Sequence, residues 1–224
     1  MGLLMFDSAT VQQVHIAGGS ERINTPSASA RSLTKRLLDL VVAASLLLIL
    51  LPALIVIGVL LSLESKGPVM FKQRRGGLLG RPFVVFKFRT MRVLEDGDTV
   101  QQASKKDSRV TAFGALLRRT SMDELPQLIN VLRGEMSLVG PRPHALAHDK
   151  EFQERCPAYA QRFTMRPGIT GLAQIRGFRG DTSCIENLEA RVSADLEYAE
   201  TWTLWTDIKL LVATLKVPLD SRAY

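Results

Sequence analysis

The feature that most constrains this chain is an uncharged apolar run of 24 residues, Leu40 to Leu63 (LVVAASLLLILLPALIVIGVLLSL). At about 1.5 Å of rise per residue, a straight helix of this length would cover the roughly 30 Å hydrocarbon core of a bilayer. We therefore expect a membrane-inserted helix. About 30 mostly polar residues precede it, which is not the arrangement of a cleaved signal peptide.

Two properties of this run bear on its topology. Pro52 lies in its middle, where a proline removes one helical hydrogen bond and bends the axis. Both flanks are basic, with Arg31, Lys35 and Arg36 on one side and Lys66 on the other. Because cytoplasmic flanks carry the positive excess, a spanning helix cannot satisfy both flanks, whereas a re-entrant hairpin can. Proline-kinked spanning helices are also common, so the residues alone leave both arrangements open.

The positive charge of the chain is concentrated next to the apolar run. The formal net charge is +7, and the segment from Glu64 to Arg92 accounts for the whole excess. Its basic residues are Lys66, Lys72, Arg74, Arg75, Arg81, Lys87, Arg89 and Arg92. Such a cluster indicates an anionic partner: nucleic acid, lipid headgroups or a phosphorylated substrate. We expect no nucleic acid, because no aromatic stacking platform or recognition motif accompanies the cluster.

The remaining patterns predict a mixed α/β domain that is mainly α-helical. Residues 1–31 are predicted to be a disordered tail, residues 32–66 to hold the membrane helix, and residues 67–224 to form a single further domain. The two cysteines, Cys156 and Cys184, lie far apart and support neither a zinc site nor a disulfide framework.

Local patterns place the main elements of this domain. Short β-prone runs at 69–71 and 83–86 indicate a hairpin, and the polar residues 95–107 a surface loop. Helices are expected from Val110, between Pro126 and Gly134, over 185–196 and over 202–215. The last helix carries an apolar stripe with Trp202 and Trp205. Such a stripe is typical of core packing, and a place at the membrane interface is the alternative.

The segment RRTSMDELP (118–126) combines two arginines, an Asp-Glu pair and a proline. A capping box with Ser121 as N-cap would put Pro126 at the fifth helical position, where its missing N–H costs a hydrogen bond. With Asp123 as N-cap, Pro126 takes the third position, whose N–H would be unpaired anyway. We expect the second arrangement, in which the positive end of the helix keeps the Asp123 carboxylate ionised.

Arginines surround this pair in the sequence. Besides Arg118 and Arg119, Arg142 lies in the loop GPRPH (140–144) and Arg166 in the loop MRPGITG (165–171). Neighbouring proline and glycine can hold such a guanidinium in place, and its planar donors suit phosphate oxygens. With the membrane run upstream, this pattern indicates phosphate chemistry at a lipid surface. His144, beside GPRP, is expected to be a solvated loop residue rather than a general base.

These residues resemble a known family. The segments SMDELPQLINVLRGEMSLVGPRP (121–143) and RPGITGLAQIRG (166–177) are similar to the bacterial sugar transferases. These are monotopic phosphoglycosyl transferases that begin exopolysaccharide, capsule and O-antigen assembly. The similarity runs from about Ser32 to the C-terminal end and includes KRLLDL (35–40), FKFRTM (86–91) and DLEYAETWTLWTDIKLL (195–211).

The resemblance implies a re-entrant, proline-broken membrane helix at 32–66 and a cytoplasmic phosphoglycosyl transferase domain at 67–224 with amphipathic interface helices. It also implies a place on the cytoplasmic face of the bacterial inner membrane. Some members have Ser-Pro at the break, whereas here Leu51 precedes Pro52. Another group must therefore satisfy the freed carbonyl.

The family reaction moves a sugar 1-phosphate from a UDP-sugar to undecaprenyl phosphate, releases UMP and uses Mg²⁺. Carried onto this chain, Asp123 resembles the nucleophile that forms an aspartyl-phosphosugar intermediate. Glu124 would help to hold the metal or accept a proton, so that Asp123 and Glu124 are the metal-site residues. The residues expected to bind substrate or phosphate are Arg118, Arg142, Arg166, Lys87 and Gln174.

The segments RGFRGDTS (176–183) and NLEARVSADLEY (187–198) are more similar to the glucose- or galactose-phosphate branch of the family. We therefore prefer UDP-glucose as the donor, followed by UDP-galactose. A catalytically silent membrane scaffold that binds anionic lipids through its basic face is the alternative, which the Asp123–Glu124 pair disfavours. Membrane lipids are expected partners in either reading, and the sequence leaves open whether two copies form a homodimer.

Overall fold

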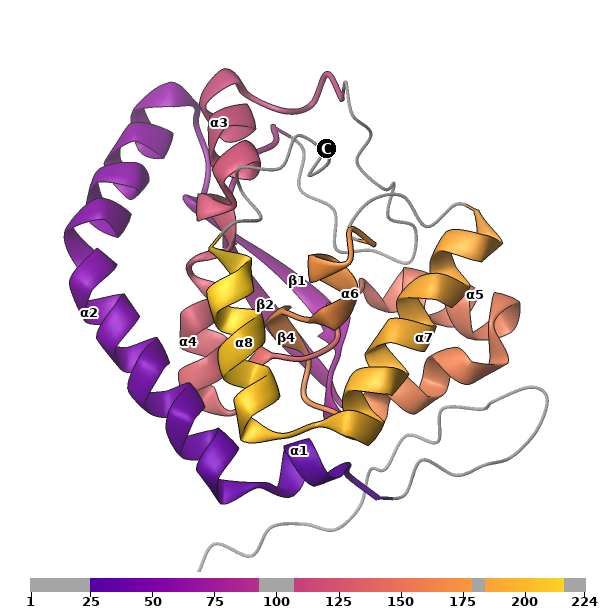
Figure 1. Ribbon diagram of the computed structural model, residues 1–224. Coiled ribbons are helices and arrows are strands. Elements are labelled where there is room, and N and C mark those ends of the chain that lie inside the picture. Colours follow the sequence, from indigo (N-terminus) through magenta and orange to yellow (C-terminus); the bar gives the residue numbers. More distant parts are fainter. Residues whose placement is uncertain (1–24, 93–106, 179–183, 216–224) are drawn as a thin grey trace, which may run out of the picture.

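The computed structural model describes residues 25–92, 107–178 and 184–215. These residues form a mainly helical structure with two small sheets (Figure 1). Most of the expected tail and of the polar loop at 95–107 lies outside the described residues. The end of the expected tail is described and contains helix α1 (Ala28–Arg31), which is tied to the domain where the Ser27 N–H donates to the Thr164 carbonyl at 2.9 Å.

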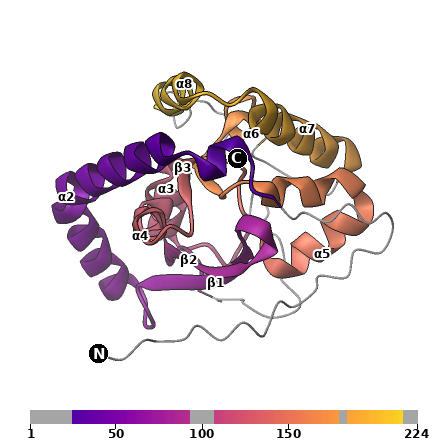
Figure 2. The ribbon, with the colours of Figure 1, turned by 90° about the horizontal axis from the view of Figure 1, so that it is seen from below.

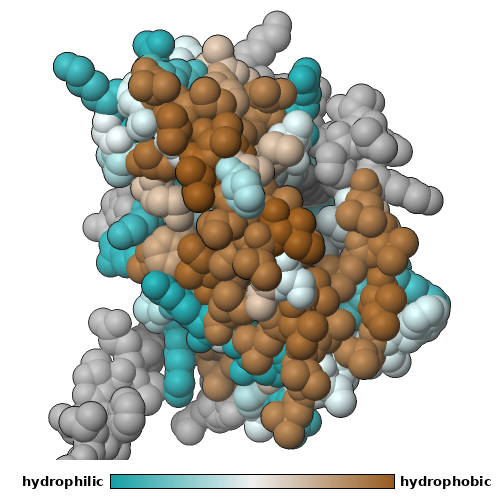
Figure 3. Space-filling model, turned by 90° about the vertical axis from the view of Figure 1, so that its left-hand side faces the viewer, coloured by the Kyte–Doolittle hydropathy of each residue, from teal (hydrophilic) through white to brown (hydrophobic). Residues whose placement is uncertain are grey.

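Helix α2 (Leu33–Glu64) contains the whole apolar run and is 32 residues long. It continues through Pro52, and Figures 1 and 2 show a long bent helix that follows one side of the domain. The expected break at Pro52 is therefore a bend within a continuous helix. Figure 3 shows the apolar face that this side of the molecule presents. Within the described ranges, α2 is the one helix long and apolar enough to cross a membrane.

Both ends of α2 are fastened to the same folded domain. Near its start, the Lys35 ammonium donates to the Asp207 carboxylate at 2.6 Å, and both side chains are buried. At its end, the Arg89 guanidinium donates to the carbonyls of Leu61 at 3.2 Å and Ser65 at 2.7 Å. These carbonyls belong to the last turn and the cap of the helix, where a cation is favourable. Arg89, one of the basic residues between Glu64 and Arg92, therefore caps the end of α2.

The predicted hairpin is confirmed. Strands β1 (Met70–Gly76) and β2 (Pro82–Phe88) pair antiparallel, with Met70 opposite Phe88 and Gly76 opposite Pro82, and the short 3-10 helix η1 (Leu78–Gly80) joins them. Side chains alternate between the two faces of a strand. Phe83, Val85 and Lys87 therefore share the buried face of β2.

A second, parallel pair of strands was not predicted. Strands β3 (Ser137–Val139) and β4 (Gly168–Thr170) are three residues each. They place the loops that carry Arg142 and Arg166 side by side, because Gly140 N–H donates to the Thr170 carbonyl and Gly168 N–H to the Pro141 carbonyl. A Cβ on Gly168 would lie 2.1 Å from the Gly140 nitrogen, so this close approach requires glycine.

Helices make up the rest of the domain. They are α3 (Ala112–Thr120), α4 (Gln127–Arg133), α5 (Leu146–Arg155), the 3-10 helix η3 (Pro157–Thr164), α6 (Leu172–Ile175), α7 (Ile185–Thr201) and α8 (Leu204–Thr214). The helices predicted around 110, 127, 185 and 202 are confirmed, and α4 ends at Gly134 with φ +83°. Their main core includes Val85, Val131, Met136, Tyr198 and Leu210.

The expectation of core packing for the tryptophan helix is wrong in part. Asp207 and Leu210 are the buried residues of α8, while Trp202 is only partly buried. Trp205 is 61% exposed and Leu215 is 76% exposed. Asp207 faces the interior, where it pairs with the buried Lys35. With Asp207 inside, part of the apolar stripe of α8 faces outward.

Candidate active site

Asp123 and Glu124 lie in η2 (Met122–Glu124), a single 3-10 turn between α3 and α4. Ser121 ends α3 in the left-handed conformation, with φ +58°, and this reverses the chain direction before the acid pair. The predicted N-cap role of Asp123 is wrong, because α4 begins at Gln127 and Pro126 takes the N-cap position. The chain already has helical dihedrals at Leu125, so no extended residue is left at Asp123 to act as a cap.

Glu124 is held by two basic side chains. Its Oε1 accepts a hydrogen bond from the Lys87 ammonium at 2.8 Å. Arg142 donates to both oxygens, from Nη2 to Oε1 at 2.5 Å and from Nη1 to Oε2 at 2.9 Å. The Arg142 contact is therefore bidentate, which is the strongest and most directional form of this pairing. Glu124 thus fixes two cations beside Asp123.

Asp123 differs from its neighbour. Its side chain is buried, with the residue 7% exposed, and its Oδ1 has no hydrogen-bond partner. Burial, and next the charge of Glu124, raise the pKa of Asp123 to about 6, while Lys87, Arg118 and Arg142 oppose this rise. The carboxylate is mainly ionised at neutral pH, but the cause is these cations and not a helix end. A buried, unpaired carboxylate oxygen costs roughly 1–3 kcal/mol, which indicates a functional role.

The cations around the pair come from three elements. Lys87 extends from β2, Arg118 from the last turn of α3, and Arg142 from the loop after β3. Burial lowers the pKa of Lys87 to about 8, although Glu124 opposes this effect. The structure therefore brings Lys87, Arg118 and Arg142 to the acid pair, and substrate binding by these residues stays a prediction.

The other two candidate residues make their hydrogen bonds elsewhere. Arg166 donates to the carbonyls of Gly134 at 3.2 Å and Ala30 at 2.5 Å, which ties α1 to the end of α4. Gln174 donates to the Ile169 carbonyl at 2.9 Å, and its buried Oε1 has no partner. Substrate binding by Arg166 and Gln174 stays a prediction.

The residues present fit a magnesium ion that the substrate helps to hold. In the described part of the chain, no group of three or more His, Cys, Asp or Glu side chains is arranged around a metal position. The Asp123 carboxylate offers hard oxygen atoms, and Glu124 is the next residue in the chain. Mg²⁺ commonly binds through one or two carboxylates together with substrate phosphates. The acid pair suits that mode of binding.

His144 is not the solvated loop residue that the sequence suggested. Its Nδ1 lies 2.6 Å from the Tyr159 hydroxyl, and its Nε2 lies 2.8 Å from the Arg191 guanidinium nitrogen Nη1. Burial, and then the charges of Arg162 and Arg191, hold the pKa of His144 well below its usual range. His144 is therefore a neutral member of a buried network behind the GPRP loop. Its partners are 15 to 47 residues away in the chain, so no local motif announced them.

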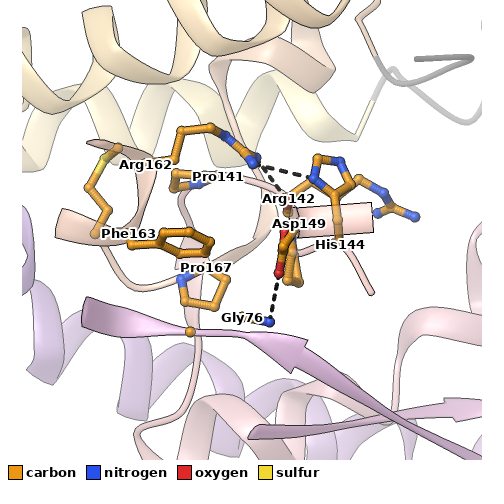
Figure 4. A pocket seen from close by; sticks show the side chains of 11 residues that line it. Gly76, Pro141, Arg142, His144, Asp149, Arg162, Phe163 and Pro167 are labelled. Carbon is orange, nitrogen blue, oxygen red and sulfur yellow. Dashed lines mark hydrogen bonds between the residues drawn. The ribbon is translucent and has the colours of Figure 1, made fainter. Parts of the chain in front are cut away.

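Figure 4 shows a small hollow that His144 and Arg162 help to line. Its walls include Gly76, Arg142, His144, Asp149 and Phe163, and its volume is about 10 Å³. That volume suits a single water molecule and not a nucleotide. This hollow is therefore too small to be a substrate site, and the acid pair remains the candidate site for substrate chemistry.

A buried acid pair surrounded by cations, next to a long helix with an exposed apolar face, defines a membrane-associated protein suited to phosphorylated substrates. The sequence profile of the bacterial sugar transferase family matches residues 30–221. The chain belongs to this family.

Three relatives carry the same name, UDP-glucose:undecaprenyl-phosphate glucose-1-phosphate transferase. The protein from Caulobacter vibrioides is 53% identical over 83% of this chain and 70% of its own length. That from Escherichia coli K12 is 48% identical over 86% of this chain and 41% of its own length. That from Xanthomonas campestris pv. campestris is 50% identical over 80% of this chain and 37% of its own length. The chain thus spans less than half of two of these relatives.

Proposed function

We propose that this protein transfers glucose 1-phosphate from UDP-glucose to undecaprenyl phosphate and releases UMP, as the first step of exopolysaccharide, capsule or O-antigen assembly. The names of the three relatives support the donor and the acceptor. The observation that carries the reaction type is the buried, unpartnered Oδ1 of Asp123, flanked by Lys87, Arg118 and Arg142. A scaffold that only binds lipids would have no use for a buried carboxylate that lowers stability.

The reaction proceeds by two displacements at one phosphorus atom. Asp123 Oδ1 attacks the phosphorus that bears the sugar, the bond from this phosphorus to the UMP oxygen breaks, and UMP leaves with the bonding electron pair. An oxygen of the undecaprenyl phosphate then attacks the same phosphorus and displaces the Asp123 carboxylate. The product is the lipid diphosphate sugar, and Asp123 is regenerated.

The neighbouring cations make the first displacement possible. A carboxylate that approaches a diphosphate meets like-charge repulsion, and fixed positive groups reduce it. Arg142 and Lys87 already have their orientation set by Glu124, so little reorganisation is needed when the donor binds. We also propose that Asp123 and Glu124 hold Mg²⁺ together with the donor. When bound, Mg²⁺ supplies further neutralisation of the diphosphate charge.

We propose that α2 enters the bilayer and returns to the same side. Its ends are fastened to one domain through Lys35 and Arg89, and a spanning helix would place them on opposite faces of the membrane. Each arm beside Pro52, of roughly 11–12 apolar residues, reaches about half of the bilayer. The basic flanks favour the cytoplasmic face of the bacterial inner membrane. The exposed Trp205 and Leu215 make α8 suitable as an interface helix.

The test is UMP release from a panel of UDP-sugars with undecaprenyl phosphate and Mg²⁺. We expect UDP-glucose to be the best donor and Asp123→Asn to lower the rate by at least about 10³-fold, because the amide keeps the shape but is a poor nucleophile. Glu151→Gln removes an exposed carboxylate and should leave the rate unchanged. An Asp123→Asn rate near that of the wild type would exclude the covalent role of Asp123.

A further inference from the structure

The loop that carries Arg142 is held by two arginines. Arg162 Nη2 donates to the Arg142 carbonyl at 2.8 Å, and Arg75 Nη1 donates to the Pro143 carbonyl at 2.6 Å. Arg142 in turn makes the bidentate contact with Glu124 beside Asp123. The backbone of this loop therefore decides where the Arg142 guanidinium points.

Arg162 is itself fixed by a second element. Its residue is 4% exposed, and its Nε donates to Asp195 Oδ2 on α7 at 2.8 Å. The guanidinium also lies 4.8 Å from the centre of the Tyr159 ring. The planar Arg162 guanidinium thus links the Asp195 carboxylate on α7 to the Arg142 carbonyl in the loop. Figure 4 shows its contacts with Arg142 and His144. A lysine, with a single compact ammonium, cannot reproduce both directions.

The far end of the loop is fixed by a second set of contacts. His144 Nε2 lies 2.8 Å from Arg191 Nη1, and His144 Nδ1 lies 2.6 Å from the Tyr159 hydroxyl and 3.3 Å from Arg162 Nη1. The Tyr159 hydroxyl donates to Asp149 Oδ1. The loop is therefore held at both ends, and Arg162 is the contact closest to Arg142.

We propose that Arg162 is a positioning residue for the transfer reaction, because it fixes the Arg142 backbone and so keeps the Arg142 guanidinium on Glu124 beside the nucleophile. This inference rests on the proposed function of the acid pair. Arg162 does not touch the reacting atoms and acts through the loop that carries Arg142. A purely structural role for the Arg162–Asp195 pair makes a different prediction, because its effects would not depend on Arg142.

A double-mutant cycle separates these roles. Arg162→Lys keeps the charge and should lower kcat by roughly 10- to 100-fold, with a smaller change in KM for the donor. In an Arg142→Lys background, the same substitution should lower kcat by less than about 3-fold, because the group that Arg162 positions is already lost. Equal losses in both backgrounds, or no loss in a folded Arg162→Lys variant, would overturn the proposal. Asp195→Asn repeats the test without changing Arg162, should Arg162→Lys fail to fold.

Hydrogen exchange provides a readout that is independent of turnover. We expect the backbone amides of Gly140, Arg142 and His144 to exchange at least about 10-fold faster in Arg162→Lys, while Arg176→Lys has no effect. Arg176 is the matched control, because it pairs with Glu197 of α7 in an exposed contact on the surface. Unchanged exchange in 140–144 would refute the positioning role. A wild-type protein that releases no UMP would instead refute the proposed function, and the exchange result would still decide whether Arg162 holds the loop.

Discussion

At the scale of single residues, two adjacent carboxylates have been given opposite environments. Glu124 has both oxygens engaged by Lys87 and Arg142, whereas Asp123 keeps Oδ1 without a partner. The first arrangement neutralises a charge and fixes two cations. The second leaves a buried carboxylate whose pKa is raised to about 6. Such a carboxylate destabilises the folded protein, but its oxygen is available to act as a nucleophile.

These environments set the pH dependence of the first displacement. The groups that face Asp123 are Glu124, Lys87, Arg118 and Arg142. Asp123 must be ionised to attack, so the rate should fall as the pH drops through about 6. Lys87, with a pKa of about 8, loses its charge as the pH rises, so the rate should fall again above about 8. The measurement is the UMP burst with donor alone, because the acceptor phosphate itself titrates near pH 6.

Lys87→Arg provides the control for this profile. Arginine keeps its charge throughout the range, so the loss of rate at alkaline pH should disappear while the loss near pH 6 stays. An alkaline limb that persists unchanged in Lys87→Arg would show that another group causes it.

Replacing Asp123 by asparagine should remove the activity and at the same time stabilise the folded protein. The pKa of Asp123 is higher in the folded protein than its ordinary value of 3.8, so its ionised form destabilises the fold above about pH 6 and this cost vanishes as the pH falls towards 4. Without donor or Mg²⁺, Asp123→Asn should stabilise the protein at pH 7.5 by about 1–3 kcal/mol, a rise in Tm of several degrees. The difference should shrink at pH 4.5. A lower Tm for the variant at pH 7.5 would contradict the burial of an unpaired charge.

At the scale of elements, the bent helix α2 is fastened to the domain at both ends. If it is re-entrant and the domain lies on the cytoplasmic face, as we propose, both flanks lie in the cytoplasm. In a Cys184→Ser background, which removes the exposed native cysteine, single cysteines at Arg31 and Lys66 should both resist a membrane-impermeant maleimide in intact cells. Both should react after permeabilisation. Labelling of one flank in intact cells would place the two ends on opposite sides and exclude the re-entrant arrangement.

Some secondary-structure elements could be predicted from the sequence and others could not. Periodicity and glycines gave the hairpin and the long helices, because these depend on residues near one another in the chain. The pairing of β3 with β4 was not predicted, since each strand has three residues and its partner lies about 30 positions away. The N-cap at Asp123 was predicted wrongly, because a cap rule considers one helix and not the buried cations of three other elements.

At the scale of the whole molecule, one buried lysine of α2 links this helix both to α8 and to the start of the loop that carries Arg142. Lys35 and Asp207 are 172 residues apart, and the same ammonium donates to the carbonyl of Val139, the residue before the GPRPH loop. Arg162 donates to the Arg142 carbonyl in the same loop. A motif search finds Asp123, Glu124 and Arg142, but no local pattern reveals Arg162, Asp195 or His144. Their roles arise only when the chain is folded.

The most direct test of the account is to trap the covalent intermediate. The protein is incubated with UDP-glucose labelled in the sugar and Mg²⁺, without acceptor, quenched, and analysed by mass spectrometry of the intact chain and of the peptide that contains Asp123. We expect a glucose-phosphate adduct on Asp123 that disappears when undecaprenyl phosphate is added and never forms in Asp123→Asn. Turnover of UDP-glucose to UMP and lipid-linked sugar with no label on the protein would contradict it.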